Sequence, residues 1–326
     1  MERISHQQFD AQDVITKYPP QLSDRNKQIV FDISSPPGAG HSGTISFSRW
    51  NPMALPETVR RGAARPDFQL RTDFFDYGPS PQDSLIWHLN FAHNDLFRFY
   101  GGSLFAQDEI QVAEHPVLAS LRHGLLDVGI NPLTVENGVP TPVLAMGVER
   151  RCRVSTDMNP DEGRPSGLYG NMFARASADA IHRATEVIDP PTISNIIAME
   201  APPYGTGRYT HEQLTYVLTT AITGFSAARL ESLEKIPDVQ TSIHTGFWGC
   251  GAYGGNRILM ALLQMIAACG AEIDSLVFHS GPDSTEYHEA SRLLDGLLPQ
   301  DQESNLERLV SQIETFGFHW GTSDGT

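Results

Sequence analysis

The chain has 326 residues, of which 40% are hydrophobic, and its formal net charge at pH 7 is −16. No apolar run approaches the roughly eighteen residues that a membrane span needs, and the negative charge argues against a protein that grips a polyanion over a broad surface. We therefore expect a soluble protein with a large core, no membrane partner and no broad nucleic-acid-binding surface.

Cysteine usage and the N-terminal sequence bear on the compartment. The first residues, MERISHQQFDAQDV, contain no apolar signal core, and the three cysteines, Cys152, Cys250 and Cys269, are an odd number without framework spacing. The sequence therefore predicts a reducing, cytoplasmic location. It carries no signal for an oligomeric state.

Residues 1–75 are rich in proline, glycine and serine, as in SSPPGAGHSG. Hydrophobic and polar residues alternate only briefly there, in IVFDIS at 29–34 and in TISFSRW at 44–50. Such short patterns between turn-forming residues indicate short strands and loops. We expect this segment to form an accessory N-terminal extension or a cap.

Residues 76–320 have the rhythm of one layered α/β domain, because apolar runs alternate with helical patterns and no internal repeat is visible. Buried strands are predicted at 142–149, 193–202, 239–247 and 273–280, and helices at 211–233 and 257–270. The last residues, 321–326, have the small polar composition of a disordered tail.

A glycine-dense loop lies between the strand predicted to end near His244 and the helix predicted to begin near Asn256. Glycines let backbone N–H groups approach a ligand closely, and a helix N-terminus adds unpaired donors, so the loop is suited to a diphosphate. It lacks the Lys-Ser/Thr ending of a P-loop and the spacing of a GxGxxG fingerprint. The alternative is a turn that serves only tight strand-to-helix packing. The five glycines are Gly246, Gly249, Gly251, Gly254 and Gly255.

The stretch GGSLFAQDEIQVAEHP, residues 101–116, places two neighbouring carboxylates, Asp108 and Glu109, after a glycine pair and a short apolar loop. A carboxyl group in an apolar setting can stay protonated near neutral pH, and a neighbouring carboxylate acts in the same direction. Such a group suits acid and base catalysis. The alternative is that Asp108 is an exposed residue that complements a helix dipole.

Together these two motifs resemble the poly(ADP-ribose) glycohydrolase family. TGFWGCGAYGG followed by LLQMIAA is similar to its phosphate-binding loop and following helix, and the glycine pair followed by QDE is similar to its glycine and Gln-Glu-Glu signature. The segment LNFAH resembles the lead-in to that signature. The resemblance covers roughly residues 85–290. It implies an α/β macrodomain, in which a mixed β-sheet sandwiched between helices holds ADP-ribose across one edge.

The resemblance also assigns roles. Glu109 becomes the catalytic acid and base, and Asp108 a hydrogen-bonding partner of the reacting ribose or its leaving group. Tyr253 is expected against the diphosphate and distal ribose. Tyr169 is expected over the ligand, with a tyrosine of a core strand as the alternative. The remaining expected substrate-binding residues are Asn90, Gly101, Gly102, Gln107, Gly249, Cys250, Gly251, Ala252, Gly254 and Gly255.

Several positions depart from the family pattern. Asn90 and His93 stand where the family has Asp and Asn, and Phe247 replaces the Asn before Trp-Gly-Cys-Gly. Asp108 is shorter than the usual Glu, and Ser280 stands where an aromatic residue is expected. The loop between the glycines and the carboxylates is also shorter than usual. Because of these departures, the sequence supports chemistry on ADP-ribose better than it supports poly(ADP-ribose) as the substrate.

We therefore predict a glycosidase that releases ADP-ribose from poly(ADP-ribose). One alternative is a hydrolase of mono-ADP-ribose attached to protein or nucleic acid, and another is a module that binds ADP-ribose without cleaving it. The intact Gln-Asp-Glu triplet disfavours the binding module. No cofactor and no metal are predicted, because His88 and His93 lack ligand spacing and residues 157–163 depart from a calcium loop.

Overall fold

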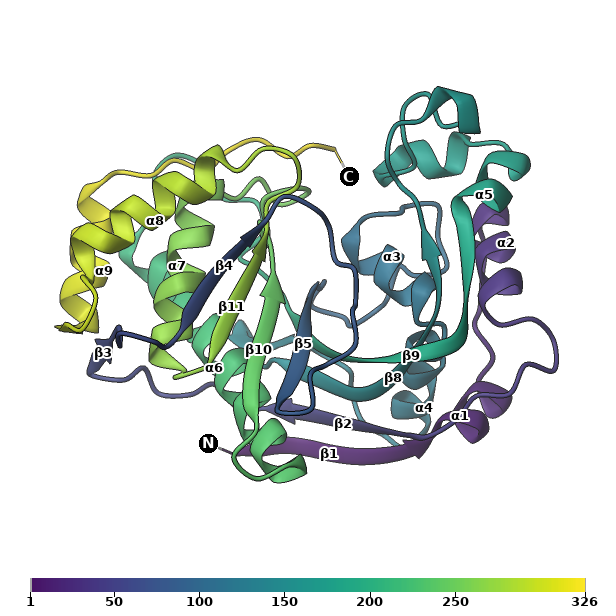
Figure 1. Cartoon of the computed structure of the whole chain (residues 1–326), viewed down its shortest axis with the longest axis horizontal. Helices are drawn as coiled ribbons and strands as arrows, with labels where there is room; N and C mark the ends of the chain where they lie inside the picture. Colours follow the sequence, from purple (N-terminus) through teal and green to yellow (C-terminus); the bar gives the residue numbers. More distant parts are fainter. Residues whose placement is uncertain (1, 326) are drawn as a thin grey trace.

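The computed structural model describes residues 2–325 and is built on one eight-stranded mixed sheet (Figure 1). The strand order is β1-β2-β8-β9-β5-β10-β11-β4. Neighbours from β9 to β4 pair in parallel, and those from β1 to β9 pair antiparallel. The predicted mixed α/β sheet is thereby confirmed. The strands are β1 (Arg3–Asp10), β2 (Thr44–Trp50), β4 (Asp67–Arg71), β5 (Ser84–Phe91), β8 (Val143–Val154), β9 (Thr185–Met199), β10 (Gln240–Thr245) and β11 (Ser275–His279).

Two helical layers cover the sheet, and each has its own apolar core. Alternate side chains of a strand point to opposite faces, so Ile197 and Met199 of β9 join one core while Ile196 and Ala198 join the other. In Figure 1 the helices of the first core lie on the left and those of the second on the right. The first core contains α6 (His211–Lys235), α7 (Arg257–Gly270), α8 (Thr285–Leu297) and α9 (Leu306–Thr315), and the second contains α1 (Ala11–Lys17), α2 (Arg25–Ser34), α3 (Gln107–Glu114), α4 (Val117–Asp127) and α5 (Ala178–Ala184).

Short elements complete the fold. Two small sheets pair β3 (Thr58–Arg60) with β12 (Glu303–Asn305) and β6 (Val135–Glu136) with β7 (Val139–Pro140). The connection from β8 to β9 forms a lobe with α5 and the 3₁₀ helices η1 (Pro160–Glu162) and η2 (Gly170–Arg175). This lobe projects at the upper right of Figure 1. No helix within residues 2–325 is long and apolar enough to cross a membrane.

The strongly periodic elements were predictable. The strands expected at 142–149, 193–202, 239–247 and 273–280 correspond to β8, β9, β10 and β11, and the two expected helices correspond to α6 and α7. Local capping supports both helices. Thr210 and Gln213 form a reciprocal capping box at α6, and the Asn256 side chain accepts from the Leu259 N–H at α7.

The strand predicted at 29–34 is wrong, although the one at 44–50 is confirmed as β2. Residues 29–34 lie inside α2, whose N-cap Asp24 accepts hydrogen bonds from the N–H groups of Asn26 and Lys27. The buried face of α2 includes these two polar residues beside Val30 and Phe31. Because two residues of the buried face are polar, the hydrophobic residues of α2 do not show a helical period in the sequence.

The first 75 residues differ from the expected accessory extension. Strands β1 and β2 form one edge of the main sheet by pairing with β8, and β4 forms the opposite edge by pairing with β11. Ile45 and Phe47 of β2 are fully buried in the second core. Strand pairing between distant segments leaves no local signal, so the sequence did not reveal this integration.

Residues 321–325 likewise differ from the expected disordered tail, and residue 326 lies outside the described residues. The Gly321 N–H donates to the Gly254 carbonyl at 2.8 Å, and the Asn171 Nδ2 donates to the Gly325 carbonyl at 2.7 Å. Trp320, just before the tail, stacks on Tyr209 at 4.2 Å between ring centroids. The tail is therefore held by backbone contacts that composition does not predict.

Candidate active site

The Gln-Asp-Glu triplet forms the first turn of α3, and Gln107 fastens this turn to the sheet. Its Oε1 accepts from the Phe91 N–H at 2.7 Å and its Nε2 donates to the Leu89 carbonyl at 3.0 Å. The amide thus satisfies both backbone groups at the end of β5, as a neighbouring strand would. Gln107 therefore sets the position of the two carboxylates that follow it.

Asp108 and Glu109 are both nearly buried, with 7% and 3% of their surface exposed. The Asn90 Nδ2 donates to Asp108 Oδ1 at 3.0 Å, and the Ala106 N–H donates to Glu109 Oε2 at 3.0 Å. Both carboxyl groups are thus oriented by donors from the segments around them. Asp108 is not the exposed helix-dipole residue considered as an alternative.

The protonation of this pair is set by burial. Burial raises the pKa of Asp108 to about 7, and the Glu109 charge acts in the same direction, whereas the hydrogen bond from Asn90 opposes it. Burial also raises the pKa of Glu109, and the opposing influence is mainly the charge of Lys27. The pair can therefore hold and release a proton near neutral pH, which acid and base catalysis requires.

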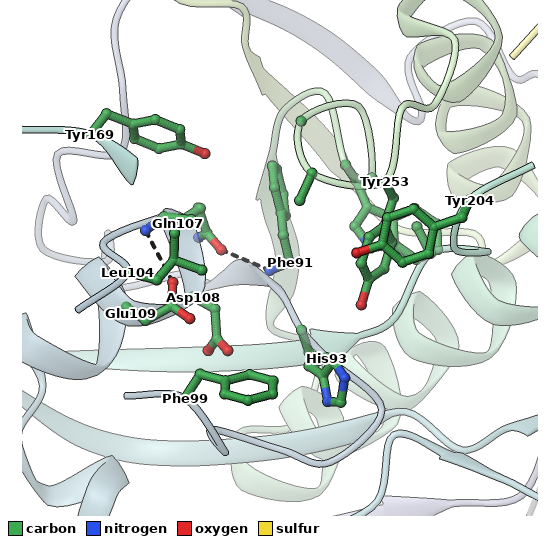
Figure 2. A pocket seen from close by; sticks show the side chains of 17 residues that line it. Phe91, His93, Phe99, Leu104, Gln107, Asp108, Glu109, Tyr169, Tyr204 and Tyr253 are labelled. Carbon is green, nitrogen blue, oxygen red and sulfur yellow. Dashed lines mark hydrogen bonds between the residues drawn. The ribbon is translucent and has the colours of Figure 1, made fainter. Parts of the chain in front are cut away.

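Both carboxyl groups line a pocket between α3, the glycine loop and the β8–β9 lobe. Figure 2 shows Tyr169 on one side of this pocket and Tyr204 and Tyr253 on the other. The lining residues are Phe91, Ala92, His93, Phe99, Leu104, Ala106, Gln107, Asp108, Glu109, Tyr169, Ala201, Tyr204, Trp248, Gly249, Gly251, Ala252 and Tyr253. The structure therefore brings the two sequence motifs to one cavity.

The glycine loop owes part of its composition to its own packing. Gly249 has a φ of +74°, and a Cβ there would lie 2.3 Å from the Ala201 Cβ. A Cβ on Gly255 would lie 2.7 Å from the Gly249 carbonyl oxygen. For a Cβ on Gly251 the three nearest atoms belong to the Asp324 carboxylate, the closest at 3.0 Å. Tight packing therefore explains two of the glycines, and Gly251 is the one that faces the pocket without backbone in its way.

Tyr253 forms a fixed wall beside this loop. Its hydroxyl donates to Glu200 Oε1 at 2.9 Å, and its ring lies 5.2 Å from that of Tyr204 between centroids. Tyr204 is 69% exposed and therefore presents its ring to solvent at the mouth of the pocket. Tyr169 caps η2 across the pocket and is not part of a core strand, which was the alternative for it.

Other expected binding residues lie behind the pocket wall. Asn90 acts through Asp108, and Gly101 is buried against the N-terminal segment, where a Cβ would lie 2.3 Å from the Gln21 carbonyl oxygen. Cys250 packs beneath the loop and donates its thiol to the Trp248 carbonyl. None of these contributes to the lining, and the same holds for Gly102, Gly254 and Gly255. A direct role for them in binding stays a prediction.

One family comparison bears on the segment that carries the loop. Residues 167–286 match the model described as poly (ADP-ribose) glycohydrolase (PARG), macro domain fold. This segment of the chain is therefore similar to the poly(ADP-ribose) glycohydrolase family. The matched segment contains the glycine loop and Tyr169, whereas the Gln-Asp-Glu triplet precedes it.

Two solved glycohydrolase structures are similar to this chain at low identity. The poly(ADP-ribose) glycohydrolase of Thermomonospora curvata is 14% identical, with 86% of this chain and 88% of that chain covered and a TM-score of 0.47. The enzyme of Deinococcus radiodurans in complex with ADP-ribose is 14% identical, with 90% and 95% covered and a TM-score of 0.43.

Phe247, the clearest departure from the glycohydrolase pattern, does not line the pocket. Its ring lies under the Arg257 guanidinium at 3.8 Å and 5.0 Å from the Phe278 ring. It therefore packs against the α7 side of the loop. Ser280, another departure, donates its hydroxyl to the Gly281 carbonyl at 2.8 Å and also lies outside the lining.

Sequence reasoning did not assign several pocket residues. Phe99 and Tyr204 belong to loops without a motif, and their exposure is visible only in the folded chain. Leu104 lies in the loop between the glycine pair and the triplet but was given no role. His93 was noted only as a departure, yet it lines the pocket. Within residues 2–325 no three His, Cys, Asp or Glu side chains are grouped so that they could hold a metal ion.

Proposed function

We propose that the protein is a glycoside hydrolase that cleaves the O-glycosidic ribose bonds of poly(ADP-ribose) and releases ADP-ribose. The observation that carries the proposal is that Asp108 and Glu109 line one pocket together with the glycine loop that contains Tyr253. A binding module needs the loop but has no use for two buried carboxyl groups whose pKa values are raised by burial. The match of residues 167–286 to the poly(ADP-ribose) glycohydrolase model supports the same activity.

In the proposed reaction Glu109 gives its proton to the leaving oxygen as the bond to the anomeric carbon breaks. An oxocarbenium-like centre forms, a water molecule attacks it, and Glu109 takes the proton that the water loses. Asp108 accepts a hydrogen bond from the reacting ribose or the leaving group. The reaction consumes one water molecule, and Glu109 ends protonated, as it began.

The glycine loop is proposed to hold the diphosphate. It lies between β10 and α7, so the backbone of Gly249 and Gly251, which line the pocket, lies near the partly positive N-terminus of α7. We propose that Tyr253 and Tyr204, which line one side of the pocket, contact the distal ribose, and that Tyr169 on the other side covers the ligand. Local neutralisation of this kind suits a chain with a net charge of −16.

The test is incubation of the purified protein with poly(ADP-ribose) of defined length and with proteins and oligonucleotides that carry a single ADP-ribose, with the products identified by mass. Release of ADP-ribose from the polymer supports the proposal. Release from the mono-linked substrates alone would favour the alternative hydrolase. Tight binding of ADP-ribose without any release would identify a binding module and contradict the proposal.

The compartment is a further proposal. Cys152, Cys250 and Cys269 are all unpaired, and burial raises the pKa of each thiol. We propose a cytoplasmic location, because free, protonated thiols suit a reducing compartment.

A further inference from the structure

The chain contains only three lysines among its 326 residues, and one of them is fully buried. Lys17 and Lys235 are exposed, whereas Lys27 on α2 has 0% of its surface exposed. Its Nζ lies 5.3 Å from the centre of the Phe105 ring and 6.0 Å from that of Phe173. A buried ammonium group destabilises a fold unless fixed polar or charged groups offset its lost hydration.

The first compensating group is a backbone carbonyl next to the glycine pair. Lys27 Nζ donates to the Tyr100 carbonyl at 2.7 Å. The adjoining Gly101 carbonyl accepts from the N–H groups of Ser23 and Asp24, at 2.9 and 3.1 Å. The beginning of the loop that leads to Ala106 and α3 is therefore held by the segment around the N-terminus of α2.

The second compensation is charge. The groups that act on the Lys27 ammonium are Glu109 and Asp108 on α3 and Asp24 at the N-cap of α2. Asp24 already accepts from two N–H groups of α2. One buried cation and two buried carboxyl groups are electrically neutral together when one carboxyl is ionised and the other protonated. This is the state that a catalyst needs if it must give up a proton and then take one back.

We propose that Lys27 is a positioning residue of the active site, which holds the loop before α3 and supplies the charge against which Asp108 and Glu109 share one proton. The proposal deepens the proposed hydrolase function and assigns a role to the N-terminal segment. Lys27 does not line the pocket, so it acts through the two carboxyl groups.

The titration directions agree with this arrangement. Burial lowers the pKa of Lys27 to about 8, while Glu109, Asp108 and Asp24 act to raise it. Burial raises the pKa of both carboxyl groups, and the charge of Lys27 opposes this rise. Arg122 on α4 opposes it to a smaller extent at Asp108. Across the pocket, burial raises the pKa of Tyr253, and the charge of Asp108 makes a small contribution in the same direction. Loss of Lys27 should therefore raise the pKa of the pair.

The first test measures the coupling without any substrate. Protein labelled with ¹³C,¹⁵N-lysine gives three ε-methylene signals, which are titrated by NMR with Lys17 and Lys235 as internal controls. We expect Lys27 to titrate well below the other two. In Glu109→Gln its pKa should fall further, by about one unit, because a nearby negative charge is lost. The exposed Glu212→Gln on α6 is the matched control and should change nothing. Identical Lys27 titrations in Glu109→Gln and the unsubstituted protein would overturn the proposal, whatever the substrate proves to be.

The second test measures the pH dependence of ADP-ribose release. In Lys27→Met both limbs of the profile should move to higher pH by about one unit, and Lys27→Arg should restore them toward their original position. Lys17→Met is the control for an exposed lysine. A lysine with a structural role alone would lower the rate at every pH and leave the limbs in place, and that result in a folded Lys27→Met protein would overturn the proposal. If Lys27→Met does not fold, the NMR titration decides.

Discussion

At the residue scale, the site depends on carboxyl groups that the fold removes from water. Asp108 illustrates the cost, because its pKa of about 7 in the folded protein lies above its ordinary value of 3.8. Between these two pH values the folded state binds more protons than the unfolded state. The contribution of Asp108 to stability is therefore complete below its ordinary pKa and is lost as the pH rises to about 7.

This linkage gives a measurable expectation for Asp108→Asn. The amide is neutral at every pH and can still accept the hydrogen bond from Asn90. The difference in unfolding free energy between the variant and the unsubstituted protein, measured in urea, should shift in favour of the variant by about 2–3 kcal/mol between pH 5 and pH 8. An equal difference in unfolding free energy at both pH values would show that Asp108 is not titrating in this range.

The residue scale also shows what sequence reasoning can reach. The Asp108 and Glu109 pair and the Tyr253 loop were predictable because each belongs to a compact motif. Lys27 was not, because its importance arises from burial beside Tyr100, which is 73 positions away in the sequence. Tyr204 was missed for the same reason, since it meets Tyr253 only in the folded chain.

At the element scale, the glycine loop separates residues that pack from residues that face the ligand. Gly251→Val should keep the melting temperature, because the atoms nearest to its Cβ belong to the Asp324 side chain and not to backbone. It should weaken ADP-ribose binding by about tenfold or more, or about 1.4 kcal/mol, because Gly251 lines the pocket. Gly255→Val should instead lower the melting temperature, because its Cβ meets backbone at 2.7 Å. Calorimetry and thermal unfolding of both variants check this. If the two variants changed the melting temperature and the ADP-ribose affinity to the same extent, Gly251 and Gly255 would not have separate roles in binding and packing.

The C-terminal segment is the second element that bears on the loop. The Asp324 N–H donates to the Gly251 carbonyl at 3.4 Å, and its carboxylate lies next to Gly251. This charge faces the place proposed for the diphosphate. Asp324→Asn should therefore tighten ADP-ribose binding about two- to fivefold, most strongly at low salt. Unchanged or weaker binding in titration calorimetry would show that the tail and the ligand do not compete for the loop.

At the scale of the whole molecule, one sheet connects the N-terminal segment to the site. The periodic strands and helices from β8 to β11 were predictable from local pattern, whereas the positions of β1, β2 and β4 depend on partners far away in the sequence. A chain that begins at residue 76 would lose both edges of the sheet and the side chains of Phe31 and Phe47 from the second core. We expect it not to fold, as judged by circular dichroism and urea unfolding. A cooperative unfolding transition in that fragment would show that residues 1–75 are an accessory extension after all.

The central claim is that Glu109 transfers the proton in ADP-ribose release, and one paired measurement tests it most directly. Hydrolysis of poly(ADP-ribose) and calorimetric binding of ADP-ribose are compared in the unsubstituted protein, Glu109→Gln and the surface control Glu212→Gln. The amide keeps the shape of Glu109 but cannot give up and retrieve a proton. We expect Glu109→Gln to lose hydrolysis while its affinity stays within about tenfold, or about 1.4 kcal/mol. Continued turnover by Glu109→Gln at the rate of the control would contradict the account.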